Sequence, residues 1–196
     1  MALLRYVEGR ELTGGDGTER RLMGETLGRV HTITRIGHRR GGFESWLTPT
    51  QREILQVPWL AAALVQVRSE FDAPPHLTWA TLHTDPAPEA FLLDPTTGEV
   101  GVIDWAGSQP GPALYDVASA VMYLRGTDAS AEFLDAYLAT GAVSTVEMGH
   151  LDVLRRFRWG GAGAVLRRAT RPQRPHRASR RTRRQPTWPG CRTPQP

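Results

Sequence analysis

The sequence of 196 residues contains no lysine, so all 24 of its basic residues are arginines. It has one cysteine, Cys191, which excludes an internal disulfide and a cysteine-rich metal site. No apolar run approaches the ~20 residues that a bilayer-spanning helix needs. These absences exclude disulfide-rich secreted proteins and membrane-spanning proteins, and we expect this protein in the reducing cytoplasm.

Acidic residues are missing from the last part of the chain. Residues 1–154 hold 11 arginines and all 20 acidic residues, whereas residues 155–196 hold 13 arginines and no acidic residue. The body is therefore acidic, and the end is strongly basic. Arginine and proline dominate 159–196, and such a segment buries too little apolar surface to offset the entropy of ordering. We expect this tail to be disordered.

The tail has two interpretations. Its arginines could bind nucleic acid through the phosphates, with an affinity that depends on salt and not on base sequence. The simpler interpretation is a solvated tail without such a role. The abrupt change of composition within an expected helix also suggests a changed reading frame or a degraded gene.

Apolar periodicity predicts a mostly helical α+β fold with a small central β-hairpin. Strands are expected at 77–82, 91–93 and 100–103, and the last two are joined by a turn at 94–98 that contains proline and glycine. The apolar spacing predicts helices over 18–36, from Thr48 to a break at Pro58, over 58–71, 113–124 and 128–138, and from Ser144, where Ser144–Glu147 forms a capping-box pattern.

Two acidic residues follow neighbouring strands of this pattern. Asp85 comes shortly after the first strand, and Asp104 comes directly after the hairpin. Phosphoryl transfer from a nucleotide needs one carboxylate to orient the acceptor hydroxyl and another to hold Mg²⁺ against the phosphates. Either aspartate alone is typical of a strand-end cap or a turn. Only the two together therefore indicate phosphoryl transfer.

The ordered set of motifs resembles the aminoglycoside phosphotransferase family, which is related to the protein kinases. The family pattern is His-Gly-Asp, an Asn five residues on, an Ile-Asp-Trp-type motif about twenty residues after the His, and a Tyr-Asp helix start. The matching residues are His83-Thr84-Asp85, Ile103-Asp104-Trp105 and Tyr115-Asp116. The resemblance covers residues 1–158 and implies the C-terminal lobe of a protein-kinase-like fold.

The resemblance implies a role for each matching residue in transferring phosphate from ATP, with Mg²⁺, to a hydroxyl of a small molecule. Asp85 would be the catalytic base, His83 would brace the catalytic loop, and Asp104 would bind Mg²⁺. Asp116 would support the loop. The segment that resembles the hinge between the two lobes, Tyr6, Val7 and Glu8, would lie against the adenine.

Three departures from the family pattern stand out. Thr84 replaces the glycine, and Ala90 falls where the second metal-binding asparagine is expected, so that only the adjacent Glu89 could supply a ligand. The N-terminal lobe, with its phosphate-binding lysine, is expected to be absent. The Arg/Pro-rich tail begins where the family's last helices should continue.

Four functions therefore stay open. The first is a small-molecule kinase, in a truncated form. The second is an inactive kinase-like remnant, and the third is a basic nucleic-acid-binding protein that acts through its tail. The fourth is a metal-dependent hydrolase using His83, Asp85 and Asp104. The acidic body suits a cationic acceptor such as an aminoglycoside, although macrolides, choline-like alcohols, sugars and amino acids are also handled by the superfamily. The sequence does not indicate an oligomeric state.

Overall fold

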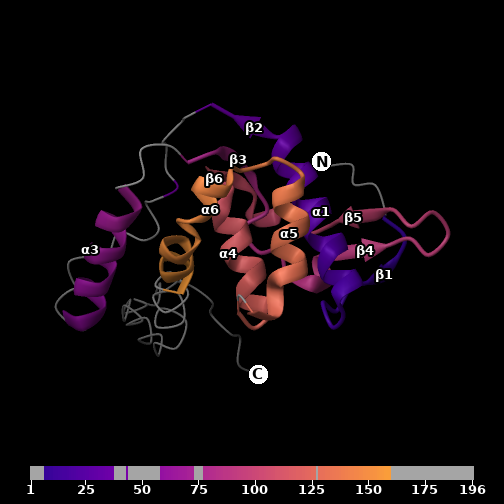
Figure 1. The fold of residues 1–196 in the computed structure, drawn as a ribbon, viewed down its shortest axis with the longest axis horizontal. Helices are drawn as coiled ribbons and strands as arrows, with labels where there is room; N and C mark the ends of the chain where they lie inside the picture. Colours follow the sequence, from indigo (N-terminus) through magenta and orange to yellow (C-terminus); the bar gives the residue numbers. More distant parts are fainter. Residues whose placement is uncertain (1–6, 38–42, 44–57, 73–76, 127, 160–196) are drawn as a thin grey trace, which may run out of the picture.

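The computed structural model describes residues 7–37, 43, 58–72, 77–126 and 128–159. Two small antiparallel sheets of three strands each are packed with helices (Figure 1). The first sheet has the order β1-β4-β5, formed by Arg10–Glu11, Phe91–Leu93 and Val100–Val102. The second has the order β2-β3-β6, formed by Arg35–Ile36, Trp79–Leu82 and Gln109–Pro112.

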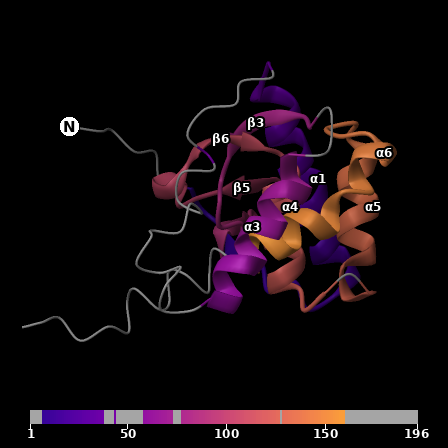
Figure 2. The ribbon, with the colours of Figure 1, turned by 90° about the vertical axis from the view of Figure 1, so that its left-hand side faces the viewer.

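The helices supply most of the core. They are α1 (Gly17–Ile33), α3 (Pro58–Asp72), α4 (Leu114–Tyr123), α5 (Ala131–Ala139), α6 (Thr145–Met148) and a last helix over 151–159. Short 3-10 turns occur at η2 (Pro88–Ala90), η3 (Trp105–Gly107) and η4 (Asp128–Ser130). Helix α4 is buried along most of its length, which agrees with its nearly continuous apolar sequence. Figure 2, which views the molecule from the α3 end, shows the strands on one side of α4 and α5.

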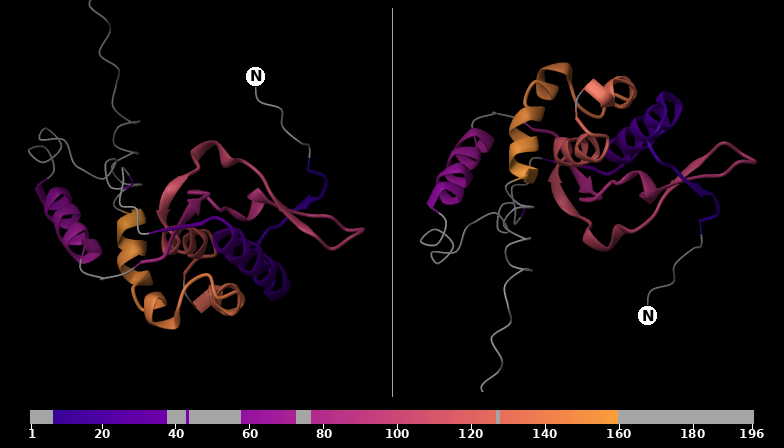
Figure 3. Two further views of the ribbon diagram at one scale, coloured as in Figure 1. Left: turned by 90° about the horizontal axis from the view of Figure 1, so that it is seen from above. Right: turned by 90° about the horizontal axis from the view of Figure 1, so that it is seen from below.

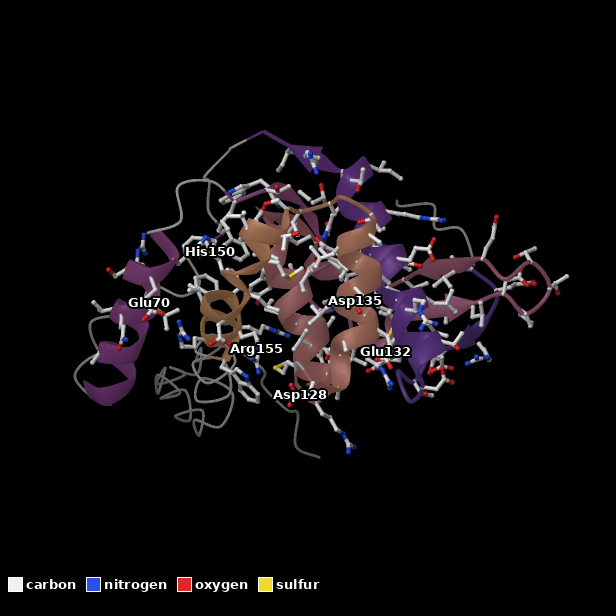
Figure 4. All side chains as sticks on the ribbon, viewed as in Figure 1. Glu70, Asp128, Glu132, Asp135, His150 and Arg155 are labelled. Atoms are coloured by element: carbon white, nitrogen blue, oxygen red, sulfur yellow. The ribbon has the colours of Figure 1, made fainter. Side chains whose placement is uncertain are left out.

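Helices α1 and α5 pack closely because α1 presents glycines to α5. A Cβ atom on Gly24 would lie 2.2 Å from the carbonyl oxygen of Phe133, and one on Gly28 would lie 2.3 Å from Oγ1 of Thr140. No side chain fits at either position without moving a neighbouring group. Arg20 on α1 adds an ion pair to Glu132 on α5, with Nε and Oε2 3.0 Å apart (Figure 4).

The central hairpin is confirmed. Strands β4 and β5 pair in an antiparallel register that places Phe91 opposite Val102. The connecting turn is closed by the amide of Gly98, which donates to the carbonyl of Asp94 at 2.8 Å. Gly98 has a φ of +72°, which explains the preference for glycine at this position. Figure 3 shows the hairpin projecting at the end of the molecule opposite α3.

Strand β6 was not expected, because Pro110-Gly111-Pro112 indicates a break in regular structure. The structure pairs it with β3, with Trp79 opposite Pro112 and Leu82 opposite Gln109. Proline cannot donate a hydrogen bond, but β6 lies at the edge of its sheet, where one side of the strand needs no partner. The sequence around 110–112 therefore suits an edge strand as well as a loop.

The predicted helices that lie within the described residues are found with three corrections. The first helix ends at Ile33 and not at residue 36, because Arg35–Ile36 pairs with β3 as β2. The capping box at Ser144 is only half formed. Ser144 accepts a hydrogen bond from the amide of Glu147, but the Glu147 carboxylate instead accepts from Thr78, through the amide and Oγ1. The helix that begins there stops at Met148, before the separate helix over 151–159.

Helix α3 is only partly buried. Val67 and Phe71 lie in the core, but Val65 is 64% exposed. Phe71 packs against Phe43 and Phe157, with ring centroids 6.3 and 5.0 Å apart. Glu70, on the side of α3 that faces the last helix, forms an ion pair with Arg156 at 2.6 Å (Figure 4). The expected helix start at Thr48 lies outside the described residues, as does the tail from residue 160.

Among the helices in the described ranges, none combines the length and the apolar character that crossing a bilayer requires.

Glu19, near the start of α1, binds the segment that precedes the helix and fixes its position. Its carboxylate accepts hydrogen bonds from the Arg10 guanidinium at 2.6 Å and from the Thr13 amide and hydroxyl at 2.8 Å each. The Arg10 and Thr13 hydrogen bonds lower the pKa of Glu19 from 4.5 to about 2. The contribution of these contacts to stability is therefore complete above pH 4.5 and is lost as the pH falls towards 2.

We expect Glu19→Gln to lower the unfolding free energy at neutral pH by about 2 kcal/mol, the usual contribution of hydrogen bonds to a charged group. The difference in melting temperature between the wild type and the variant should shrink steadily between pH 5 and pH 2, about the range over which Glu19 is protonated. Thermal unfolding followed by circular dichroism across this range measures it. A difference that stays constant with pH would show that the charge of Glu19 contributes nothing.

Candidate active site

A cavity of about 390 Å³ lies where β3 and β5 end. It is lined by His83, Thr84, Asp85, Asp104, Ala106, Gly107, Gln109, Tyr115 and Arg158. The structure therefore brings Asp85 and Asp104 to one cavity, although 19 positions separate them in the sequence. A larger hollow of about 560 Å³ lies over α1 and α5, but its one acidic residue, Glu25, is already paired with Arg29.

The loop that carries Asp85 is held by a buried carboxylate on α4. Asp116 accepts hydrogen bonds from the backbone amides of His83, at 2.6 Å, and of Thr84, at 2.8 Å. His31 of α1 lies 3.2 Å from the same carboxylate through Nε2, and its Nδ1 lies 2.8 Å from the Tyr137 hydroxyl. Burial raises the pKa of Tyr137 well above 10, so its hydroxyl stays protonated beside Nδ1 of His31. The carboxylate of Asp116 accepts, so His31 Nε2 is the donor in that contact.

His83 connects this loop to the end of the hairpin. Its side chain is buried, and Nε2 donates a hydrogen bond to the carbonyl of Ile103 at 2.7 Å. Nδ1 consequently accepts the long hydrogen bond, 3.4 Å, from the amide of Asp85. The ring also meets Trp105 edge to face, with centroids 5.0 Å apart. Both ring nitrogens are engaged within the protein, so His83 positions the loop and has no free nitrogen for proton transfer.

Two residues of the site adopt a backbone conformation that is rare outside glycine. Thr84, at the position of the expected glycine, has a φ of +75°, and Asp104 has a φ of +61°. This conformation costs on the order of 1 kcal/mol for a residue with a Cβ atom. At Thr84 this conformational cost is partly offset by the hydroxyl, which donates a hydrogen bond to the carbonyl of Gly107 at 3.1 Å. The left-handed turn at Asp104 ends β5 and places that residue on the cavity.

Asp85 is held by two donors that share one oxygen. The Tyr123 hydroxyl donates to Oδ1 of Asp85, and Nη2 of Arg158 donates to the same atom at 2.8 Å. Burial and this contact raise the pKa of Tyr123 to about 12, so the hydroxyl remains a donor at neutral pH. The second oxygen, Oδ2, has no hydrogen bond to any of the described residues, and it is the atom that can receive a proton from a substrate.

Arg158 reaches the cavity from the last helix. Its Nη1 lies 3.3 Å from the Tyr115 hydroxyl, and its guanidinium lies over the Tyr115 ring, 5.7 Å from the centroid. Burial alone would lower the pKa of Arg158, but Tyr115, Asp85 and Tyr123 together raise it above its ordinary value. The guanidinium is therefore charged and held from two sides.

The carboxylate of Asp104 is exposed and makes no hydrogen bond with any described residue. No group of three or more His, Cys, Asp or Glu side chains comes together in the described ranges in a way that could enclose a metal ion. Mg²⁺ does not need such a cage, because it usually binds through one or two carboxylates, several waters and the phosphates of a substrate. The donor set therefore fits Mg²⁺ bound together with a nucleotide at Asp104.

The cavity combines two acidic residues, one after β3 of the second sheet and one after β5 of the first, and comparison with known families decides the relationship. The model of the phosphotransferase enzyme family (APH) matches residues 1–157. The chain belongs to this family. No curated protein sequence matches it closely enough to add a relative.

Solved structures similar to this family member share its kinase-like fold. An amicoumacin kinase in complex with AMP-PNP, Ca²⁺ and Ami has a TM-score of 0.66 at 14% identity, over 86% of this chain and 57% of its own. A choline kinase from Streptococcus pneumoniae has a TM-score of 0.60 at 17% identity, over 85% of this chain and 62% of its own. A choline/ethanolamine kinase family protein from Mesorhizobium loti has a TM-score of 0.58 at 21% identity, over 86% of this chain and 62% of its own. The chain thus spans about three fifths of these structures.

Two expectations from the family pattern concern η2: Ala90 occupies the position of the second metal ligand, and Glu89 could substitute for that ligand. Ala90 is 6% exposed and packs in the core, so the position of the expected second ligand faces away from solvent. Glu89 is exposed, but it does not line the cavity that contains Asp85 and Asp104. A role for Glu89 as the substitute ligand therefore stays a prediction, and this structure places its side chain outside that cavity. The reason is that the 3-10 turn directs neighbouring residues to opposite environments.

The segment expected to lie against the adenine passes over the hairpin. Val7 lies against Gly101 of β5, where a Cβ atom would come within 2.5 Å of the valine Cγ1. Glu8 is exposed, and Tyr6 lies outside the described residues. Neither Val7 nor Glu8 lines the cavity that contains Asp85 and Asp104, and the contact of the whole segment with a nucleotide stays a prediction.

Sequence reasoning missed the two residues that contact Asp85. Tyr123 follows Asp116 by seven residues, which places both on nearly the same face of a helix, and this spacing was a usable signal. Arg158 carries no comparable signal, because Arg155 and Arg156 precede it on the same helix and only the packing of that helix selects among them.

Proposed function

We propose that this chain is the part of a small-molecule phosphotransferase that binds Mg-ATP and orients the hydroxyl of the acceptor. The observation that carries the proposal is the shared cavity of Asp85 and Asp104 in a chain of the phosphotransferase enzyme family. Phosphoryl transfer requires a catalytic carboxylate and a metal-binding carboxylate, both on rigid elements. Asp85 and Asp104 are our candidates for these two roles.

The proposed chemistry assigns a different task to each oxygen of Asp85. Oδ1 is held by Tyr123 and Arg158, which leaves Oδ2 to accept the proton of the acceptor hydroxyl. The acceptor oxygen then forms a bond to the γ-phosphorus of ATP, while the bond from that phosphorus to the β,γ-bridging oxygen breaks and its electron pair leaves with ADP. Mg²⁺ held by Asp104 supplies charge neutralisation of the phosphates.

The test is the effect of Mg-ATP on the melting temperature of the wild type and of Asp104→Asn. At ten times its dissociation constant, a ligand contributes about 1.4 kcal/mol, which is a rise of roughly 3–6 °C for a chain of this size. We expect this rise in the wild type with Mg²⁺ and ATP together. We expect it to vanish in Asp104→Asn, because an amide is a poor ligand for Mg²⁺ beside the phosphates.

Glu99→Gln is the matched control. Glu99 is an exposed acidic residue in the same hairpin, just before β5, and it is outside the cavity. The control variant should keep the full rise with Mg-ATP. If the wild type shows no rise, or if both variants behave alike, Asp104 does not bind the metal and the proposal fails.

The inactive remnant remains the second candidate, and the burial of Ala90 favours it. A side chain that packs in the core cannot supply a second metal ligand. This candidate predicts stabilisation by Mg-ATP without phosphate transfer to any acceptor. The two candidates therefore separate when transfer and binding are measured on the same preparation.

A further inference from the structure

Arg158 gives the cavity a positive charge beside the proposed base. It is the only arginine among the described residues that line the cavity, and the chain contains no lysine. Its side chain is 15% exposed. The contacts to Asp85 and to the Tyr115 ring restrict the guanidinium to one place, so a ligand would meet it already positioned.

The guanidinium has an unused donor. Arginine carries five N–H groups, of which one on Nη2 is given to Asp85 and one on Nη1 to the Tyr115 hydroxyl. Nε is buried without a partner in the described residues, so it is out of reach of a ligand. The Tyr123 hydroxyl is a third partner of this guanidinium. Of the four N–H groups on Nη1 and Nη2, one is left, and a charged donor of this kind binds a carboxylate or another oxyanion.

The charges of the cavity do not favour a cationic acceptor. Arg158 neutralises Asp85, and Asp104 is the proposed ligand of Mg²⁺. No other acidic side chain lines the cavity within the described residues, so an ammonium group near Asp85 would meet Arg158 without a carboxylate of its own. The net acidity of the body, which suggested a cationic acceptor, therefore does not extend to this cavity.

We propose that the acceptor is a hydroxy acid, a small molecule whose hydroxyl binds at Asp85 and whose carboxylate binds Arg158. This inference rests on the proposed phosphotransferase function and names its class of substrate. The two protein groups touch each other, with Nη2 and Oδ1 2.8 Å apart, so a short hydroxy acid reaches both. The carboxylate gains a charged hydrogen bond from Arg158, and the hydroxyl faces Oδ2.

The test compares three probes of similar size and different charge: 3-hydroxybutyrate, butane-1,3-diol and choline. Each is titrated against the ¹⁵N-labelled full chain, and amide shifts of the cavity residues give the dissociation constant. We expect 3-hydroxybutyrate to bind about tenfold more tightly than the neutral diol, because of the charged hydrogen bond. Choline should bind more weakly than either.

Arg158→Gln should remove the preference for 3-hydroxybutyrate over the diol. Arg156→Gln is the matched control, because it removes the same charge from the same helix, and Arg156 pairs with Glu70 and Asp152 away from the cavity. The control should keep the preference. Arg158→Lys retains the charge without the planar donors, and it should keep part of the preference even if the glutamine variant is poorly folded.

Several results would overturn the inference. With the wild type, these are tighter binding of choline than of 3-hydroxybutyrate, or binding of none of the probes. With Arg158→Gln, they are a surviving preference for 3-hydroxybutyrate over the diol, or a loss of affinity for Mg-ATP but not for the hydroxy acid. The last result would assign Arg158 to the nucleotide phosphates. The Mg-ATP melting test is independent of these titrations, so a failure of the phosphotransferase proposal is distinguished from a failure of the acceptor class.

Discussion

Replacing Asp116 with alanine is expected to lower the unfolding free energy by about 3–5 kcal/mol, the usual cost of removing one partner from a buried charged network. The carboxylate is fully buried and accepts from the amides of His83 and Thr84 and from His31. Alanine leaves all three donors buried without an acceptor, and it opens a cavity in place of the carboxylate. A loss of this size is a large fraction of the stability of an ordinary domain.

Urea unfolding followed by circular dichroism measures this loss. Asp135→Ala is the control, because Asp135 is an exposed acidic residue on α5 (Figure 4), and a surface substitution of this kind changes stability by about 0.5 kcal/mol or less. Equal stabilities of the Asp116 and Asp135 variants would contradict the buried network. In ¹⁵N spectra, the amides of residues 83–85 should also shift in the Asp116 variant, because the loop loses its anchor.

The second large effect concerns Asp85. We expect Asp85→Asn to lower phosphate transfer from Mg-ATP by a factor of about 10²–10⁴, the usual contribution of a positioned general base. The amide cannot take the proton at the position of Oδ2. Binding of Mg-ATP should be almost unchanged, because Asp104 and not Asp85 is the proposed metal ligand.

Release of inorganic phosphate or formation of a phosphorylated acceptor measures the transfer, and the melting temperature measures the binding. Asp104→Asn should lose both, whereas Asp85→Asn should lose only transfer, and Glu99→Gln should lose neither. An Asp85→Asn variant that transfers phosphate within tenfold of the wild type would exclude Asp85 as the base. A wild type that binds Mg-ATP and transfers nothing would favour the inactive remnant.

The separation of these effects follows from the way the cavity is built. His83, Thr84 and Asp85 are three consecutive residues, yet the amides of the first two are held by Asp116 and the side chain of the third by Tyr123 and Arg158. Stability and the proposed catalysis therefore rely on different side chains of α4 and of the last helix. A substitution can remove one without the other.

The family and the order of its motifs follow from the amino-acid sequence alone, because they depend on local patterns. The hairpin around 94–98 was predictable, since proline and glycine set the geometry of the turn, and so were α4 and the start of the last helices. The positions of Asp85 and Asp104 after strands also required only the strand pattern, but the strands are not neighbours, because β3 and β5 belong to different sheets. The expected boundary at 158, the absent N-terminal lobe and the disordered tail stay predictions.

Only the tertiary structure decided which side chains meet. Arg158 lies 73 positions after Asp85, and no local pattern distinguishes it from Arg156. Glu89 and Ala90 differ by one position, but the direction of each depends on the backbone of η2, which turns the alanine into the core and the glutamate to solvent. The sequence by itself therefore determined the family and its two carboxylates. Packing between distant segments determined what holds the carboxylate of Asp85, because contacts across a fold depend on three-dimensional distance and not on spacing along the chain.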